Sequence, residues 1–291
     1  MQTQEQLAEQ FEEHRDHLRS VGYRMLGSTT EADDAVQEAW LRLSRTDTTD
    51  VRNLRGWLTT VVSRICLDQL RSRASRRELS LDAHVPDPVV TRIDDDPADA
   101  AAQADDVTLA MLVVLDALNP RERMAFVLHD MFGVPFDTIG EIVGTTPTNA
   151  TQLASRARRR VRDTPPPVAD LATQRRVLQA FTAAAERGDF EALVAVLDPD
   201  VTLRADAGPS GASRVIHGAA RVAASASAFR RGNHELEQLV VLVNGDLGLV
   251  GLRDGRPVSV FSPVIRDGRI HEINILLDPD RLARIDLGEL V

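Results

Sequence analysis

The sequence predicts a multidomain protein in which two all-α domains are followed by an α+β domain. Apolar residues recur at helical spacing through most of the first 162 residues. Within this part, two short helices separated by a glycine-containing turn precede an arginine-rich helix. After the stiff boundary at Thr164-Pro165-Pro166-Pro167, two helices lead into strands separated by Asn-Gly and Asp-Gly dipeptides.

Charge is unevenly distributed along the 291 residues. The net charge of −10 alone argues against a nucleic-acid binder. Residues 51–80, however, hold seven Arg against two acids, and residues 81–106 hold eight Asp against one Arg. All 34 basic residues are Arg, so every basic site has the planar fork of a guanidinium. The positive charge is therefore local, and the acidic charge belongs to a linker.

Several classes of protein are disfavoured by what the sequence lacks. The lone Cys66 excludes an intramolecular disulfide and any metal site built on paired cysteines. The seven His have no metal-ligand spacing, so we expect no metal and no cofactor. No signal peptide and no apolar run of membrane-spanning length is recognisable, which indicates a cytoplasmic protein without a membrane partner.

The first domain, residues 5–78, begins with helical periodicity over residues 5–44. Leu7, Phe11, His14 and Leu18 share one face of the first helix. A second helix, from Thr30, directs inward Ala35, Val36, Ala39, Trp40 and Leu43. Its outward side chains are Asp33, Asp34, Gln37, Glu38 and Arg42. Periodicity alone does not distinguish a binding function for this charged face from ordinary exposure to solvent.

A third helix is predicted over residues 52–78. Its apolar face consists of Leu58, Val61, Val62, Ile65 and Leu70. The other side carries Arg, Thr and Asn, with Trp57 near the start. Guanidiniums beside an aromatic ring suit an unpaired nucleic-acid strand, because bases stack while the cations hold phosphates. Trp57 as a plain core residue remains an open alternative.

The second domain, residues 107–163, contains a helix-turn-helix pattern. Asn119 is a good N-cap, Pro120 suits the first helical position, and Glu122 has capping-box spacing. A helical stripe follows at Phe136, Ile139 and Val143, and Gly144 ends it. Thr146-Pro147 begins the next helix.

The helix from Thr146 to Arg162 carries the polar chemistry of this domain. Between Ala150 and Arg162 there are five Arg and no acid. Two polar stripes run along it, one of Asn149, Gln152, Arg156 and Arg159 and one of Thr151, Ser155, Arg158 and Arg162. Amides and guanidiniums can bond bidentately to base edges and contact phosphates. A solvated amphipathic helix is the alternative, but the capped helix-turn-helix before it favours DNA binding.

Two stretches together closely resemble extracytoplasmic-function sigma factors. The run Asp33–Arg42, followed by Trp57–Arg71, resembles their region 2, and the helix-turn-helix resembles their region 4. The resemblance covers residues 8–162 apart from the linker. It implies two all-α sigma domains, a region 2 helical bundle and a region 4 helix-turn-helix, and two partners: RNA polymerase core and promoter DNA.

The resemblance also implies roles for matching residues. Docking on the clamp helices of polymerase core is expected for Asp33, Asp34, Gln37, Glu38, Leu41 and Arg42. Melting and reading of the −10 element is expected for Asn53, Arg55, Trp57, Thr60, Arg64, Arg71 and Arg73. Reading of the −35 element is expected for Asn149, Thr151, Gln152, Ser155, Arg156, Arg158 and Arg159. Many relatives have Arg in place of Thr151, so the −35 preference is expected to differ.

The linkers are residues 79–106, rich in Asp, Pro and Ala, and residues 164–170, rich in Pro. The composition of the first predicts a flexible acidic tether. Within it, His84-Val85-Pro86-Asp87-Pro88 resembles a Trp-Leu-Pro-Glu-Pro motif of the subgroup that carries a C-terminal SnoaL-like domain. Leu277–Leu282 resembles its Asn-Pro-Asp-Lys-Leu motif, and Asp206-Ala207-Gly208 stands where it has an Asp-Gly-Gly-Gly-Lys loop. The interdomain regulatory residues implied are Pro86, Asp87, Pro88, Asp206, Gly208, Asp278, Pro279, Asp280, Arg281 and Leu282.

The last domain, residues 171–291, is predicted to be α+β. Helices are expected at Leu171–Arg187, Phe190–Leu197 and Ala219–Phe229, and a strand at Val201–Ala205. An antiparallel meander follows, with turns at Asn244-Gly245, Asp254-Gly255 and Asp267-Gly268. The pattern resembles the SnoaL and ketosteroid-isomerase-like cone, a curved sheet wrapped on helices.

Three functions are compatible with this organisation. The first is an alternative sigma factor, not an enzyme, whose C-terminal domain modulates it in cis, with a small-molecule ligand in the pocket as an open option. The second is a ketosteroid-isomerase or polyketide-cyclase-type enzyme fused to a DNA-binding module, with Asp206, His217, His234 or His271 as general base. No paired acid–base signature supports it, so no catalytic residue is assigned. The third is a helix-turn-helix repressor, against which the strand-melting helix argues.

Overall fold

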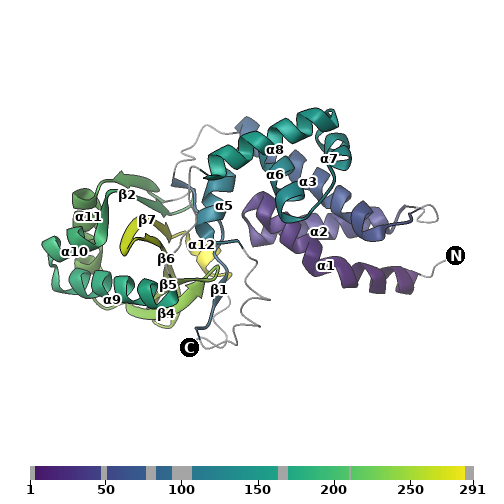
Figure 1. Cartoon of the computed structure of the whole chain (residues 1–291). Coiled ribbons are helices and arrows are strands. Elements are labelled where there is room, and N and C mark those ends of the chain that lie inside the picture. Colours follow the sequence, from purple (N-terminus) through teal and green to yellow (C-terminus); the bar gives the residue numbers. More distant parts are fainter. Residues whose placement is uncertain are drawn as a thin grey trace. The chain divides into compact units, whose positions relative to one another are not determined.

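A computed structural model describes residues 4–46, 51–76, 83–93, 107–162, 170–209 and 211–285 (Figure 1). The chain divides into two compact units. Unit 1 consists of Met1–Glu78 and Val114–Pro165, and unit 2 consists of Leu79–Val113 and Pro166–Val291. The linker between the two predicted helical domains therefore belongs to the same unit as the C-terminal domain. The boundary at residues 164–167 lies outside the described residues.

Unit 1 is helical, as the sequence predicts. Its elements are α1 (Gln4–Leu26), α2 (Thr29–Leu43), α3 (Leu54–Arg76), α6 (Pro120–Phe126), the π-helical turn η2 (Val127–Met131), α7 (Phe136–Val143) and α8 (Pro147–Arg162). Helix α5 (Leu109–Asp116), which the sequence analysis did not predict, begins in unit 2 and ends in unit 1. It is apolar almost throughout, so it has no amphipathic period from which it could be recognised.

Helices α1, α2 and α3 pack around a common core. Phe11 and Leu18 are buried as predicted, and the rings of Phe11 and Trp40 lie 5.2 Å apart. Ser28 caps α2 by accepting a hydrogen bond from the Glu31 N–H. Trp57 is half-buried, so part of its side chain remains accessible to solvent.

The helix-turn-helix forms at the residues from which it was predicted. Asn119 accepts a hydrogen bond from the Arg121 N–H at 3.0 Å, and α7 ends at Gly144 with φ 71°. The capping-box prediction for Glu122 is wrong, because its buried carboxylate instead pairs with Arg160 of α8 at 3.1 Å. The turn is tight: a Cβ on Gly140 would lie 2.9 Å from the carbonyl oxygen of Thr145.

The two helical domains share an interface inside unit 1. Arg123 of α6 is 1% exposed, and its Nη2 donates to the carbonyl oxygen of Arg24 in α1 at 3.2 Å. Its Nη1 donates to Asp116 at 2.9 Å. The Arg24 guanidinium lies 4.8 Å from the ring centroid of Phe132, which also meets the ring of His17 edge-on. A buried cation and an aromatic ring thus join the two domains.

Unit 2 is built on one seven-stranded sheet in the order β1-β4-β5-β6-β7-β2-β3. The strands are β1 (Val90–Thr91), β2 (Leu197–Asp206), β3 (Arg214–His217), β4 (Glu237–Val243), β5 (Asp246–Arg253), β6 (Arg256–Arg266) and β7 (Arg269–Leu276). The three predicted turns are confirmed, because Asn244, Asp254 and Asp267 all have positive φ. The predicted antiparallel meander is confirmed in β4, β5, β6 and β7, and β2, for which no pairing was predicted, pairs parallel with β7. Strands β1 and β3, in predicted linker and loop, were missed.

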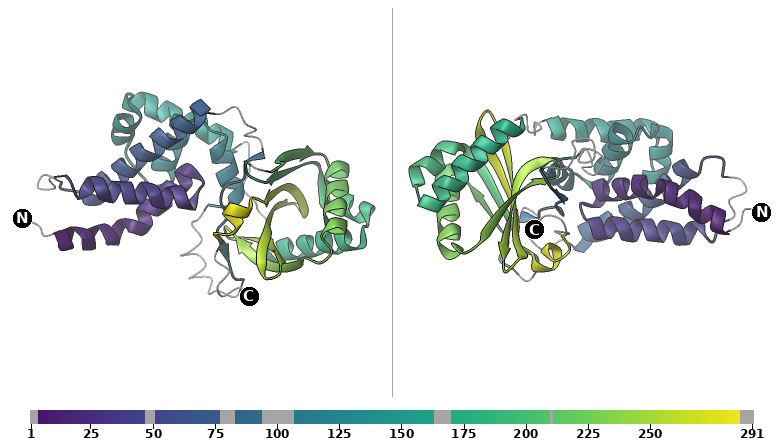
Figure 2. Two further views of the ribbon diagram at one scale, coloured as in Figure 1. Left: turned by 180° about the vertical axis from the view of Figure 1, so that it is seen from behind. Right: turned by 90° about the horizontal axis from the view of Figure 1, so that it is seen from below.

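The sheet curls around three helices, which gives the predicted SnoaL-like cone (Figure 2). These helices are α9 (Leu171–Arg187), α10 (Phe190–Val196) and α11 (Ala219–Gly232). Their buried residues include Phe181, Leu193 and Val222, which join Leu203 and Ile273 of the sheet in one core. A short helix, α12 (Pro279–Leu282), follows the last strand. None of the described helices has the length and apolar character needed to cross a membrane.

Candidate regulatory and DNA-binding sites

Helix α8 buries one face and presents another to solvent. Ala150, Ala154 and Ala157 are fully buried against the rest of unit 1. The exposed predicted readers of the −35 element are Asn149, Thr151, Gln152, Ser155, Arg156 and Arg159. Their side chains share one solvent-facing surface, as a helix that enters a major groove requires.

The arginines of α8 differ in their partners. Nε of Arg158 donates to Asp130 at 2.6 Å, and this side chain is only 32% exposed. Arg156 and Arg160 both lie near Glu122, at 3.7 and 3.1 Å. Within the described residues, no carboxylate lies within 4 Å of Arg159, so among the predicted arginine readers it is the one most free to contact DNA.

Some of the predicted −10 residues of helix α3 are exposed, and others form hydrogen bonds that hold the helix in place. Arg55 donates to Nδ1 of His17 at 3.1 Å, and Asn53 caps the helix through the Gly56 N–H at 2.9 Å. Arg64 and Arg71 are exposed, whereas Thr60 bonds back to the Gly56 carbonyl. Arg73 donates to the carbonyl oxygen of Leu26 and pairs with Glu31, so it holds α3 to its neighbours.

The predicted polymerase-docking surface lies on one side of α2. Its members Asp33, Asp34, Gln37, Leu41 and Arg42 are exposed, and Glu38 is half-buried. Arg42 pairs with Glu38 at 3.0 Å, and Arg19 of α1 pairs with Asp33 at 2.9 Å. Leu41 is 40% exposed, which gives this charged surface an apolar centre.

The strongest polar cluster of unit 2 joins the linker to the C-terminal domain through Arg281. Nε of Arg281 donates to Asp87 at 2.5 Å, Nη1 to Asp206 at 2.8 Å, and Nη2 to the Val85 carbonyl oxygen at 2.5 Å. The three charged side chains are 7–15% exposed. We call His84, Val85, Asp87, Asp206 and Arg281 the linker clasp. Charge-assisted hydrogen bonds of this kind, shielded from water, are among the stronger polar contacts in proteins.

Asp206 is the acceptor at the centre of the linker clasp. Besides Arg281, its carboxylate accepts from the Val85 N–H at 3.0 Å, the Gly208 N–H at 3.0 Å and His84 Nδ1 at 3.1 Å. Burial opposes ionisation of this carboxyl, but hydrogen bonds from His84, Val85 and Gly208 outweigh it and hold its pKa well below the usual range. An ionised Asp206 with several donors is a structural anion and not a general base.

Gly208 and Asp278 shape the domain side of the linker clasp. Gly208 has φ +70°, and a Cβ there would collide with the Asp278 carboxylate. Asp278 caps α12 by accepting from the Asp280 and Arg281 N–H groups at 2.9 and 3.3 Å. The cap fixes the start of the helix that carries Arg281, while Leu282 is buried and Pro279 and Asp280 are exposed.

A second attachment holds the linker on either side of residues 94–106. Oδ1 of Asn244 accepts from the Val89 N–H at 3.0 Å, and its Nδ2 donates to the Val107 carbonyl oxygen at 3.4 Å. Next to it, β1 adds to the edge of β4. Pro86 and Pro88 are buried. The prediction of a flexible tether is therefore wrong for residues 83–93, whereas residues 79–82 and 94–106 lie outside the described part.

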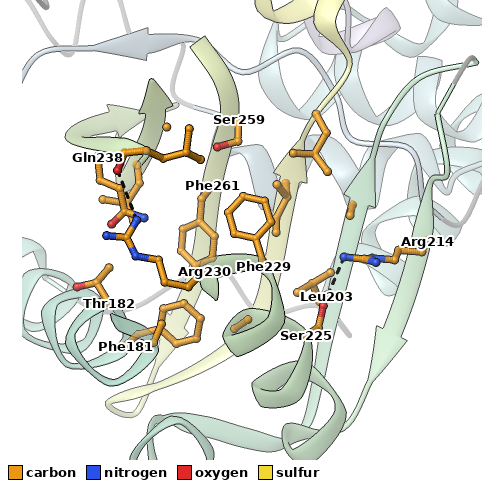
Figure 3. Close-up of a pocket in the computed structure, with 18 residues that line it drawn as sticks. Phe181, Thr182, Leu203, Arg214, Ser225, Phe229, Arg230, Gln238, Ser259 and Phe261 are labelled. Carbon is orange, nitrogen blue, oxygen red and sulfur yellow. Dashed lines mark hydrogen bonds between the residues drawn. The ribbon is translucent and has the colours of Figure 1, made fainter. Parts of the chain in front are cut away.

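A cavity of about 90 Å³ lies between α9, α11 and the sheet. Phe181, Phe229 and Phe261 lie around it (Figure 3). Among the described residues that line it, there is no Asp, Glu or His. Asp206 and the three candidate histidines lie elsewhere: His217 bonds to Thr202, His234 is exposed, and His271 is 3.5 Å from Asp198. The enzyme alternative named these four residues as candidate general bases, and none of them lines the cavity.

Metal and thiol chemistry find no support. Within the described parts of the chain, no group of three or more His, Cys, Asp or Glu side chains could hold a metal ion. Burial raises the pKa of the Cys66 thiol to about 12, so this cysteine is a core residue and not a reactive one.

Sequence reasoning overlooked two residues that hold the linker, Asn244 and His84, and one residue that supports Asp206 from its own domain, Ser213. Asn244 was predicted only as a turn residue, and its side chain binds two linker residues. His84 and Ser213 were not singled out as clasp residues, although both lie within hydrogen-bond distance of Asp206. The motif resemblance around His84 was the one available signal, because the partner residues are more than 100 positions away.

Comparison with known proteins covers both units. Residues 10–76 match the family Sigma-70 region 2, and residues 108–161 match Sigma-70, region 4. The chain is 39% identical to the ECF RNA polymerase sigma factor SigJ of Mycobacterium tuberculosis, over 96% of this chain and 94% of SigJ. It is 36% identical to the probable ECF RNA polymerase sigma factor SigI of the same species, over 94% of this chain and 95% of SigI. The crystal structure of SigJ matches with a TM-score of 0.75 and 34% identity, covering 97% of this chain and 100% of that one.

Proposed function

This chain belongs to the ECF family of RNA polymerase sigma factors, and we propose that docking of its own linker on its C-terminal domain controls its activity. As a member of that family it is an alternative sigma factor, which directs transcription initiation at particular promoters. The linker clasp is the observation that carries the proposal. It connects Asp87, between the two sigma regions in the sequence, to Asp206 and Arg281 of the C-terminal domain.

The dimensions of unit 1 support a role for the docked linker in restraining the separation of regions 2 and 4. The −10 and −35 elements are separated by about 25 base pairs, roughly 85 Å of duplex at 3.4 Å per pair. Unit 1 has about 130 residues, and a compact unit of that size has a radius of gyration of about 14 Å. The interface through Arg123 must therefore open before regions 2 and 4 can reach both elements. A linker held at residues 83–93 limits that opening, because it leaves less free chain between the regions.

We assign contacts with the promoter and with polymerase to predicted residues whose side chains are exposed to solvent. We assign the −35 element to the solvent-facing surface of α8, with Arg159 as its principal unpaired cation, and the −10 strand to Arg55, Trp57, Arg64 and Arg71 of α3. The α2 surface around Leu41 is assigned to polymerase core. Arg73, Arg158 and Asn53 are assigned supporting roles, since their side chains already hold neighbouring elements.

The enzyme alternative has less support. Its chemistry needs a positioned acid or base, and the described lining of the cavity contains neither a carboxylate nor an imidazole. We therefore propose that the C-terminal domain regulates and does not catalyse, with a small molecule as a candidate effector.

The experiment is promoter-dependent transcription with purified polymerase core and the DNA upstream of the protein's own gene. The full chain is compared with Asp87→Ala, which removes the linker's carboxylate from the clasp, and with Glu237→Ala, an exposed carboxylate on β4. We expect Asp87→Ala to raise the initiation rate and Glu237→Ala to leave it unchanged. Equal rates for all three proteins would refute control by the linker, and a full chain unable to bind core would refute the assigned polymerase surface.

A further inference from the structure

The cavity of unit 2 shares its walls with the linker clasp. Ala205 and Leu277 line the cavity, and the next residue in each case is Asp206 or Asp278. The Leu277 N–H donates to the Asp206 carbonyl oxygen at 2.6 Å, so the two wall segments are joined at this point. Arg214 also lines the cavity and follows Ser213, whose hydroxyl lies 3.4 Å from the Asp206 carboxylate. Successive residues of a strand point to opposite faces, so one side chain of each pair lines the cavity and the other lies on the side of the linker clasp.

The lining is apolar at its centre and basic at its edge. The rings of Phe181 and Phe261 stack with centroids 5.5 Å apart, and Phe229 lies beside them (Figure 3). Two guanidiniums complete the lining. That of Arg230 is engaged by Glu186 at 3.2 Å and by the Leu236 carbonyl oxygen.

Arg214 has a different environment. Its Nη2 reaches only the hydroxyl of Ser225, at 3.5 Å, and no described carboxylate lies within 4 Å of it. A guanidinium beside an apolar cavity, with its fork directed to no acid, suits a carboxylate of a ligand. Arg214 is exposed to solvent, so the cavity presents an apolar site with a solvent-accessible cation at its edge.

The cavity has room for a small organic ligand. About 90 Å³ is several times the roughly 10–15 Å³ that one water molecule requires. It is therefore large enough for one ring or a short branched chain. Gly251 contributes to this space, because a Cβ at that position would displace the hydroxyl of Ser259.

We infer that the cavity binds a small aromatic or branched-chain carboxylic acid, and that its occupancy is coupled to the linker clasp. The inference rests on the proposed control by the linker and supplies its effector. The ring or branched chain lies among the three phenylalanines, and the carboxylate pairs with Arg214. A ligand that changes the separation of β2 and β7 at Ala205 and Leu277 moves Asp206 and the start of α12, and so changes the affinity of the domain for the linker.

Binding is tested by calorimetry on the full chain with three probes: benzoate, isovalerate and benzyl alcohol. We expect both acids to bind, with benzoate about tenfold tighter than the neutral alcohol because of the ionic hydrogen bonds. Arg214→Gln is expected to remove that tenfold preference. Ala226→Leu fills the cavity from α11 and should abolish binding, whereas Ala228→Leu, exposed on the same helix, should preserve it. Absence of binding by all three probes, or unchanged binding by Ala226→Leu, overturns the site.

Coupling is tested by reciprocity. If benzoate and the linker clasp are linked, Asp87→Ala changes the Kd of benzoate by about fivefold or more. Benzoate must then change the exchange protection of the Val85 N–H in the wild-type protein by the same factor. Equal Kd values in both proteins overturn the coupling, while the proposed control by the linker still stands if Asp87→Ala alters initiation without benzoate. A changed Kd with unaltered initiation refutes control by the linker and leaves the ligand site intact.

Discussion

Arginine has different roles in the two units of this protein. In unit 1, α8 presents Arg156 and Arg159 to solvent, and the described residues of unit 1 leave both exposed. In unit 2, Arg281 is 15% exposed and donates to two carboxylates and one carbonyl oxygen. The first arrangement leaves donors available for a partner molecule. The second uses every nitrogen of the guanidinium within the chain.

The difference is between exposed guanidiniums with free donors and a largely buried guanidinium whose donors are all used within the chain. An exposed arginine loses little in stability when it is replaced, but it loses a contact to phosphate or base. A buried arginine leaves unpaired carboxylates behind, so its replacement changes the conformational equilibrium of the chain. Replacement of an exposed arginine should therefore change DNA binding, whereas replacement of a buried arginine should change stability or the conformational equilibrium.

The largest effect is expected at Arg123, the buried cation between α6 and α1. Arg123→Ala removes the hydrogen bonds from the buried guanidinium to Asp116 and to the carbonyl oxygen of Arg24, and should lower the free energy of unfolding of unit 1 by about 3–5 kcal/mol. Both tryptophans, Trp40 and Trp57, belong to unit 1, so their fluorescence in a urea titration reports on this unit. Arg121→Ala, exposed on the same helix, should cost less than about 0.5 kcal/mol. Equal costs for both variants would contradict the buried role.

The next largest effect is expected for Arg281. Arg281→Ala removes three hydrogen bonds of the linker clasp and should shift the docking equilibrium of the linker by about 2–4 kcal/mol. The loss is measured as faster amide exchange at Val85 and in β1. Arg256→Ala, an exposed arginine of the same sheet, is the matched control. A double-mutant cycle with Asp87→Ala should give non-additive costs, and additive costs would mean that the two side chains act independently.

Replacement of Arg159 should affect DNA binding with little effect on stability. Arg159→Ala should weaken binding to −35 DNA by about 1–3 kcal/mol and reduce the salt slope by about one if the contact is to phosphate. Arg160, which pairs with Glu122, is the comparison: Arg160→Ala should alter binding less. Fluorescence anisotropy at several salt concentrations measures both. The reverse order of effects would move the DNA contact to the other edge of α8.

The smallest effect is a pH dependence from His17. Burial and the neighbouring Arg55 lower the pKa of His17 from 6.5 to about 4. The unfolded chain therefore binds this proton more tightly, so stability is complete above pH 6.5 and falls as the pH decreases toward 4. Because His17 is partly exposed, solvent screening reduces the effect, and the free energy of unfolding should be about 1 kcal/mol lower at pH 5. His17→Gln should remove this part of the dependence, and His234→Gln should not; an unchanged profile for His17→Gln would contradict the assignment.

The helical half could be predicted in detail because its signals are local. Asn119, Pro120 and Gly144 set the limits of helices through caps that involve neighbouring residues. The outer surface of α8 follows from a period of 3.6 residues. The interface through Arg123 could not be predicted in this way, because its acceptor Arg24 lies 99 residues away.

The linker clasp was only partly accessible to sequence reasoning. The motif resemblance identified Asp87, Asp206 and Arg281, but composition indicated a flexible tether for the segment that contains Asp87. Acidic, Pro-rich chains normally cannot bury enough apolar surface to remain ordered. Here a guanidinium and a sheet edge supplied by other parts of the chain stabilise the segment, and neither can be read from residues 83–93 alone.

Amide hydrogen exchange of residues 83–93, measured in the free protein and in its complex with polymerase core, tests control by the linker most directly. In the free protein, the Val85 N–H should be protected by the Asp206 carboxylate. On formation of a promoter-competent complex, this protection should disappear together with that of β1. A linker that remains equally protected in a complex that initiates transcription would contradict the account.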